Sequence, residues 1–145
     1  MCDIFWSDGC SQDDYNIFWD VLAFDATYGR NKYNLPVIVF SEVNHLNQTC
    51  VFATAMVLCE SQASYVWVLQ TFLQCMKGKA PTGMITDGDR SMRLAIQEVF
   101  PGAHHRLCAW YLLKNATSNV CKPRITTLFR HCMLADLEVE EFEKH

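Results

Sequence analysis

The sequence lacks the features that would place it in a membrane or in the secretory pathway. Its 145 residues contain no apolar run that reaches roughly 18 residues, about the minimum expected of a transmembrane helix. No positively charged segment precedes a hydrophobic run near the first residue, as a signal peptide would require. Internal repeats and low-complexity tracts are also absent. We therefore expect neither a membrane span nor a signal peptide.

The eight cysteines do not form the close pairs that are typical of zinc-binding or redox motifs. No Cys-x-x-Cys occurs, and without a secretory signal reduced thiols in an intracellular protein are favoured over a disulfide framework. His104, His105 and Cys108 would supply three soft ligands at most, which is too few for a closed structural zinc site. We expect no zinc in this segment.

Charge is sparse and unevenly distributed. Half of the residues are hydrophobic, enough for one domain with a real core, and the net charge of −4 argues against coating nucleic acid by charge alone. Residues 1–29 contain no Lys or Arg, whereas residues 102–135 contain no Asp or Glu. The bases of that second segment are either a phosphate-facing surface or the solvated side of an ordinary helix pair. They are Arg106, Lys114, Lys122, Arg124 and Arg130.

Short runs of β-branched and aromatic residues predict three strands, at residues 19–25, 35–40 and 50–59, which short connections would join as an antiparallel meander. Residues 83–86 and 103–107 predict a fourth and a fifth strand. The first strand ends in Asp25, and Asp87 directly follows the fourth. A buried strand gains nothing from an unpaired carboxylate. Asp25 is therefore paired, exposed at the rim of the sheet, or bound to a metal.

Helical periodicity follows the third strand. An apolar stripe from Tyr65 to Met76 predicts a helix, with Ser61 or Ser64 as its N-cap and Gly78 at its end. Asp89 can cap a second helix that reaches Phe100, and residues 109–120 and 124–135 predict two more. A strand–helix–strand unit after a meander gives an α/β fold, with a mixed sheet and helices packed on its faces.

Five short motifs resemble, in order and spacing, the transposase domain of Mutator-like elements. They are Phe24-Asp25-Ala26-Thr27-Tyr28, Val43-Asn44-His45 with Gln48, Glu60-Ser61 before Trp67, Ile85-Thr86-Asp87-Gly88-Asp89, and His105-Arg106-Leu107-Cys108-Ala109-Trp110. The likeness spans roughly residues 5–144 and is greatest to the plant far-red-impaired-response family of transposase-derived transcription factors. It implies a ribonuclease H-like fold, truncated within a helical insertion.

The resemblance also implies the residues of a DDE transposase core. Its first two acids align with Asp25 and Asp87, which would be catalytic and would bind Mg²⁺ or Mn²⁺ in an active enzyme. The third acid comes from a helix beyond the insertion and lies outside this chain. Residues 1–18 would be a lead-in segment, 19–120 the ribonuclease H-like core, and 121–145 the start of the insertion. The acids Glu138, Glu140, Glu141 and Glu143 lie too early for the third acid and are expected on a solvated face.

Two positions depart from the family pattern. Tyr111 stands where members with intact transposase usually carry His after Cys-x-x, and Trp19 stands where the family usually has Gly. Tyrosine is a poor replacement for a neutral imidazole, whether that His serves a metal or DNA. The departure at Tyr111 therefore favours a chain without catalysis.

The resemblance leads to two functional hypotheses. The first is a nuclear, DNA-associated regulator of transcription that uses this domain as a scaffold or dimerisation surface. The alternative is a catalytic-core fragment of an active Mutator-like DDE transposase, which cleaves DNA and transfers strands with a divalent metal. A stand-alone interaction module without DNA contact is a third option. The expected partners are DNA, bound together with additional domains, and a second subunit in a homo- or heterodimer. Neither a membrane nor a small-molecule substrate is expected.

Overall fold

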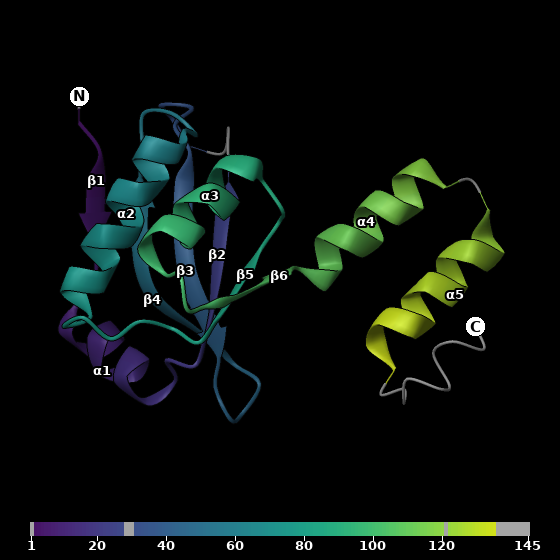
Figure 1. Ribbon diagram of the computed structural model, residues 1–145, viewed down its shortest axis with the longest axis horizontal. Helices are drawn as coiled ribbons and strands as arrows, with labels where there is room; N and C mark the ends of the chain where they lie inside the picture. The colour runs from purple at the N-terminus through teal and green to yellow at the C-terminus, as the bar shows by residue number, and fades with distance from the viewer. Residues whose placement is uncertain (1, 28–30, 121, 136–145) are drawn as a thin grey trace. The chain divides into compact units, whose positions relative to one another are not determined.

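The computed structural model describes residues 2–27, 31–120 and 122–135, and it divides the chain into two units, residues 1–106 and 107–145 (Figure 1). The acidic run from Glu138 to Glu143 lies outside the described residues. The first unit contains a sheet and three helices. Its elements are β1 (Ile4–Trp6), α1 (Gly9–Ile17), β2 (Val21–Thr27), β3 (Val37–Val43), β4 (Thr49–Met56), α2 (Gln62–Cys75), β5 (Gly83–Thr86), α3 (Arg90–Val99) and β6 (His104–Leu107).

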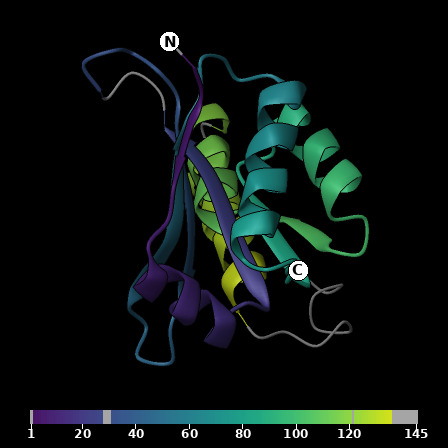
Figure 2. The ribbon, with the colours of Figure 1, turned by 90° about the vertical axis from the view of Figure 1, so that its left-hand side faces the viewer.

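The six strands form one mixed sheet in the order β1-β4-β3-β2-β5-β6. The pairs β2–β3, β3–β4 and β1–β4 are antiparallel, whereas β2 and β5 run parallel. A parallel pair needs a crossover connection, and the segment between β4 and β5 supplies one through α2. Figure 2 shows α2 and α3 on the same side of the sheet. The α/β class with a mixed sheet is confirmed.

The strands of the predicted meander are present, but their ends differ from the predicted ones. β2 begins at Val21 and continues to Thr27, because Asp25 and the two residues after it pair with β3. The expectation that Asp25 ends its strand is therefore wrong. The sequence does not predict β1, because a strand of three residues is too short to show the alternation of apolar and polar residues that marks a strand.

The core is built on stacked and edge-packed aromatic rings between the sheet and the helices. The ring of Phe40 lies 4.4 Å from that of Phe72 and 5.1 Å from that of Phe24, centroid to centroid, with both pairs stacked. The ring of Tyr65 meets that of Phe24 edge-on, and the ring of Tyr15 meets that of Phe72 in the same way. All five side chains are buried. Ring pairs in these geometries stabilise by about 0.5–1.5 kcal/mol beyond their area, so this cluster ties α1 and α2 to β2 and β3.

The helix ends follow the predicted caps. The Ser64 N–H donates to the Ser61 hydroxyl at the start of α2, and the Met92 N–H donates to the Asp89 carboxylate at the start of α3. At the other end of α2, the Gly78 N–H donates to the Leu73 carbonyl. Gly78 adopts a φ of +80°, a conformation that glycine reaches without strain. The predicted helix ends at Ser61, Gly78 and Asp89 are confirmed.

The second unit contains two helices, α4 (Ala109–Asn119) and α5 (Pro123–Leu134), which contact each other. Both match the predicted helical segments closely. Neither helix has a fully buried residue among those described. In the part of the chain that the structure describes, no helix is long and apolar enough to cross a membrane.

We predict that Phe72→Ala lowers the free energy of unfolding by about 3–5 kcal/mol, because it removes the ring that joins α2 to Phe40. Denaturant titration would measure the change. Gln74→Ala, at an exposed position of the same helix, serves as the matched control and should change stability by less than about 0.5 kcal/mol. Equal effects of the two substitutions would contradict the aromatic core.

Candidate functional site

The pairing of β2 with β5 aligns the two candidate acids. The ladder joins Val21 to Gly83, Leu22 to Met84 and Ala23 to Ile85, so each partner lies 62 positions further along the chain (83 − 21 = 62). Asp25 and Asp87 are also 62 positions apart (87 − 25 = 62). Continued by two residues, the same register would place Asp25 opposite Asp87, which directly follows the last residue of β5. The two acid-bearing strands are therefore neighbours in the sheet, while the roles of the two acids stay a prediction.

Both acids also follow the same alternation of exposure. Along β2, Leu22 and Phe24 are buried, and Val21, Ala23 and Asp25 are half-buried. Along β5, Met84 and Thr86 are buried, and Gly83 and Ile85 are half-buried. Asp87 comes next in this alternation and is half-buried. Because side chains alternate between the faces of a strand, Asp25 belongs to the face opposite the one on which Phe24 meets Tyr65 of α2. Asp87 directly follows the last residue of β5.

The far end of the β2–β5 pair is held by one carbonyl group. The Asp20 carbonyl oxygen accepts hydrogen bonds from the Thr82 N–H (3.0 Å), the Gly83 N–H (2.8 Å) and the Thr82 hydroxyl (2.6 Å). These hydrogen bonds fix where β5 starts relative to β2. A slip by one residue would send every side chain of β5 to the other face, so this clamp helps to set the position of Asp87.

The turn that carries Asp87 into α3 is held by its own side chains. The Asp89 N–H donates to the Asp87 carboxylate (3.0 Å), and the Gly88 N–H donates to the Thr86 hydroxyl (3.2 Å). Gly88 has a φ of +95°, where a residue with a Cβ would be strained. Asp89 caps α3, as predicted. These bonds hold the Asp87 carboxylate beside the helix start.

His105 of β6 supports this turn through Thr86. The His105 Nε2 lies 2.8 Å from the hydroxyl oxygen of Thr86, which is the buried polar side chain of the described core. Burial, and then the nearby Arg93 guanidinium, lower the pKa of His105. A neutral ring can accept a hydrogen bond at Nε2, and the Thr86 hydroxyl is already occupied as an acceptor. We therefore assign Thr86 as the donor to His105.

Further carboxylates lie near the same end of β5. The Tyr65 hydroxyl is 3.5 Å from a carboxylate oxygen of Glu60. Burial raises the pKa of Tyr65, and the charges of Glu60, Asp89 and Asp87 raise it further. The sequence pattern assigns no role to Glu60 or Thr86 and places Tyr65 at the start of the apolar stripe of α2. Both Glu60 and Thr86 stand in family motifs, which is the signal in the sequence that points to them.

The donor set fits a hard divalent cation. Carboxylate oxygens are the ligands that Mg²⁺ and Mn²⁺ prefer, and Asp25 and Asp87 lie at the same end of the neighbouring strands β2 and β5. Within residues 2–27, 31–120 and 122–135, however, no group of three or more His, Cys, Asp or Glu side chains is arranged to hold a metal. Asp25 and Asp87 would thus supply part of a metal site. His104, His105 and Cys108 do not form a metal cluster of that size either.

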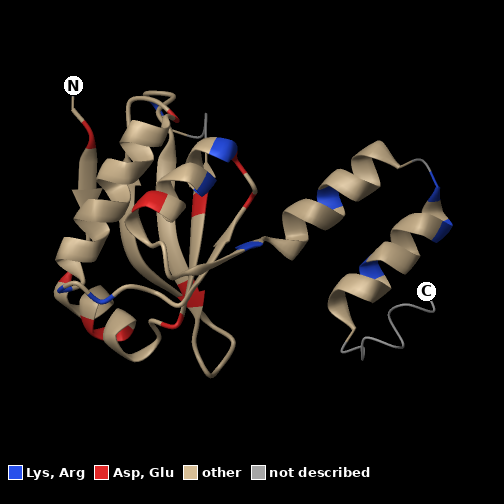
Figure 3. Cartoon of the chain, viewed as in Figure 1, with Lys and Arg blue, Asp and Glu red and all other residues tan. Residues whose placement is uncertain are grey.

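The predicted DNA-binding residues occupy the chain from β6 onward. Arg106 lies in β6, Lys114 in α4, Lys122 just before α5, and Arg124 and Arg130 in α5. All five side chains are exposed. Figure 3 shows that the charged residues of α4 and α5 are basic only. The exposure and charge of these residues suit contact with phosphate, and their role stays a prediction.

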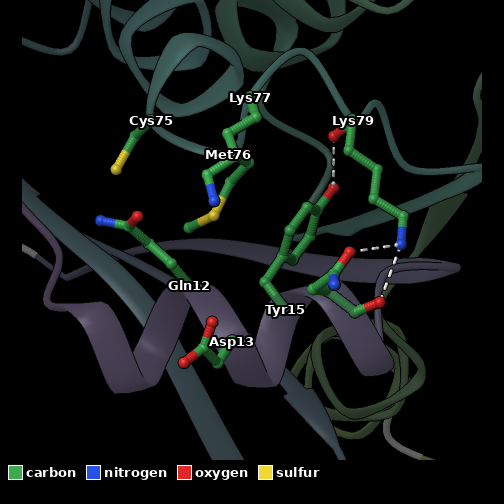
Figure 4. Close-up of a pocket in the computed structure, with 8 residues that line it drawn as sticks. Gln12, Asp13, Tyr15, Cys75, Met76, Lys77 and Lys79 are labelled. Carbon is green, nitrogen blue, oxygen red and sulfur yellow. Dashed lines mark hydrogen bonds between the residues drawn. The ribbon is translucent and has the colours of Figure 1, made fainter.

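A pocket of about 230 Å³ lies between α1 and the C-terminal end of α2 (Figure 4). The Tyr15 hydroxyl donates to the Lys79 carbonyl (3.0 Å), and the Lys79 ammonium donates to the Asn16 carbonyl (2.7 Å). These bonds fasten α1 to the loop after α2. The pocket contains none of the predicted site residues, and it lies at the opposite end of α2 from Glu60.

The comparisons with known proteins agree with the sequence resemblance. The model of the MULE transposase domain family matches residues 21–115. Protein FAR1-RELATED SEQUENCE 5 of Arabidopsis thaliana is 37% identical over 97% of this chain, and Protein FAR-RED IMPAIRED RESPONSE 1 of the same plant is 34% identical over 97%. Protein FAR1-RELATED SEQUENCE 9, also of Arabidopsis thaliana, is 30% identical over the same share. The chain spans 18% of the length of the first two relatives and 27% of the third.

We predict a pH dependence of stability that His105 carries. Because its pKa is lowered in the folded chain from the ordinary 6.5, the unfolded chain binds the proton more readily, and stability falls as the pH falls below 6.5. His105→Gln keeps an acceptor near Thr86 and removes this titration. Its free energy of unfolding should therefore decline less than that of the parent between about pH 7.5 and about pH 5. His104→Gln, at the exposed neighbouring position, should retain the parent slope; equal slopes for all three chains would contradict the assignment.

We also predict that Mn²⁺ binds at the paired acids. Asp25→Asn and Asp87→Asn should each weaken binding by at least roughly tenfold, since even the loss of a group that only orients a ligand costs about 10- to 100-fold. Electron paramagnetic resonance of free Mn²⁺ would measure the affinity. Asp20→Asn, at the other end of β2, is the matched control and should bind as the parent does. Loss of binding in the control alone would place the ion elsewhere.

Proposed function

Since the chain belongs to the MULE transposase domain family, we propose that it is the ribonuclease H-like part of a transposase-derived nuclear protein. In this proposal the protein associates with DNA, regulates transcription and does not itself catalyse transposition. The observation that carries the transposase ancestry is the common offset of 62 residues between β2 and β5 and between Asp25 and Asp87. An acid pair of this kind is what the family's DDE core requires.

The arrangement of the sheet supports the ribonuclease H-like assignment. Three strands form an antiparallel meander, and a helix then carries the chain to a strand that runs parallel to the first of the three. β2 thereby becomes a central strand, with Asp25 on it and Asp87 just beyond its neighbour. The shared chemistry of the family is therefore expected at this end of the β2–β5 pair.

Likeness to the far-red-impaired-response proteins supports a regulatory role. The similarity extends through 97% of the chain and includes a relative whose name refers to a far-red response. Tyr111, where family members with intact transposase usually have His, points in the same direction. The exposed bases of α4 and α5 supply the positive charge that DNA association needs.

The alternative is a catalytic core, and the retained acid pair favours it. A divalent cation bound there would activate a water or a DNA 3′-hydroxyl and stabilise a leaving oxygen. Asp25 and Asp87 would bind the ion, while Thr86 and His105 hold the turn that carries Asp87. A third carboxylate would have to come from outside the described residues.

A strand-transfer assay on the complete protein that contains this chain separates the two functions. We expect the parent to bind duplex DNA and to give no strand-transfer product with Mg²⁺ or Mn²⁺. Asp25→Asn and Asp87→Asn should leave DNA affinity unchanged. A product made by the parent and lost in both variants would overturn the regulatory proposal and establish the transposase.

The same protein preparation tests DNA association itself. Replacing Lys114, Lys122, Arg124 and Arg130 together by Gln should weaken duplex binding and flatten its dependence on salt, by a slope of about 0.9 for each phosphate that is no longer neutralised. Mobility shifts at several salt concentrations would measure both quantities. Unchanged affinity and slope would favour an interaction module without DNA contact.

A further inference from the structure

Trp110, near the start of α4, has a side chain that is 60% exposed. Its indole ring meets neighbours on its own helix. The ring of Tyr111 lies 4.9 Å away, nearly perpendicular to the indole at 85°, and the Lys114 ammonium lies 5.0 Å from an indole ring centroid. Burying an aromatic ring is among the largest gains available to a core. An indole left exposed and set beside a cation is therefore a candidate contact for a ligand.

The charge around Trp110 limits the kind of ligand. Residues 107–135 contain four bases and no Asp or Glu. Lys114, Lys122, Arg124 and Arg130 are all exposed, and Figure 3 shows basic and no acidic residues on α4 and α5. A basic surface without acids complements a polyanion. Aromatic rings set among bases are the usual means of binding the bases and phosphates of a single strand.

Trp6 in β1 provides an internal contrast. Its side chain is 59% exposed, nearly the same as that of Trp110. It lies, however, in residues 1–29, which contain six Asp residues but neither Lys nor Arg. Repulsion by those acids disfavours a nucleic acid there. The two residues thus share exposure and differ in local charge.

We propose that Trp110 stacks on an unpaired base of single-stranded DNA, with Lys114 holding an adjacent phosphate. This inference rests on the DNA association proposed above. It adds that α4 binds single-stranded DNA in preference to duplex DNA. A duplex covers the faces of its bases with their neighbours, so the indole would have no base face to contact. The bases of a single strand can be splayed out and stacked on aromatic rings.

Fluorescence anisotropy of the whole chain with a labelled oligothymidylate, and with a duplex of equal length, tests the proposal. Trp110→Ala should weaken binding to the single strand by roughly 5- to 150-fold, the equivalent of one stacked base, and leave duplex binding unchanged. Trp110→Phe keeps a ring and should restore most of the affinity. Lys114→Gln should lower the salt slope for the single strand by about 0.7. Trp6→Ala is the matched control and should behave as the parent.

The possible results separate this inference from the proposed function. Single-strand binding that is the same for Trp110→Ala, Trp6→Ala and the parent would overturn the stacking role, while duplex binding by the parent would leave DNA association standing. Equal losses on both kinds of DNA in Trp110→Ala would show an effect on folding or on the placement of Lys114, and would also overturn the stacking role. If the parent bound neither DNA, the stacking role and DNA association through this chain would both be wrong. Circular dichroism of each variant identifies any that fail to fold. If Trp110→Ala fails to fold, the single-strand affinity of Trp110→Phe decides whether an aromatic ring at this position supports binding.

Discussion

The parallel pairing of β2 with β5 is the constraint on which the candidate site depends. It is fixed at one end by the Asp20 carbonyl, which accepts hydrogen bonds from Thr82 and Gly83. At the other end the same register carries the chain to Asp25 and Asp87. A shift of one residue would turn every side chain of β5 to the other face. The position of Asp87 relative to Asp25 therefore depends on the backbone hydrogen bonds at Asp20.

That pairing is stabilised by packing on the other face of the sheet. Phe24 lies in β2 between Ala23 and Asp25, whose side chains belong to the opposite face. Its own ring packs against those of Phe40 and Tyr65. Burial and the charges of Glu60, Asp89 and Asp87 raise the pKa of Tyr65. Tyr65, which packs α2 against Phe24, therefore also has its hydroxyl beside the Glu60 carboxylate. His105 acts similarly from β6, through Thr86, on the turn that holds Asp87.

Sequence reasoning predicted the elements with strong periodicity and the acids that follow apolar runs. The stripe from Tyr65 to Met76 and the caps at Ser61 and Asp89 depend on local chemistry, and both are present. β1 and the continuation of β2 to Thr27 depend on pairing with β4 and β3, which no local pattern reports. The hydrogen bond of His105 with Thr86 joins residues 19 positions apart, and only the fold brings them together. The acid pair was predicted through a family likeness; spacing alone left Asp25 open to three explanations.

Two carboxylates that share one ion at the end of the β2–β5 pair are the central claim. Anomalous diffraction from crystals of the chain soaked in Mn²⁺ tests it most directly. We predict one anomalous peak within coordination distance of both the Asp25 and the Asp87 side chains, absent from crystals of Asp87→Asn. Side chains of Asp25 and Asp87 on opposite faces of the sheet, or a peak that touches neither of them, would contradict it.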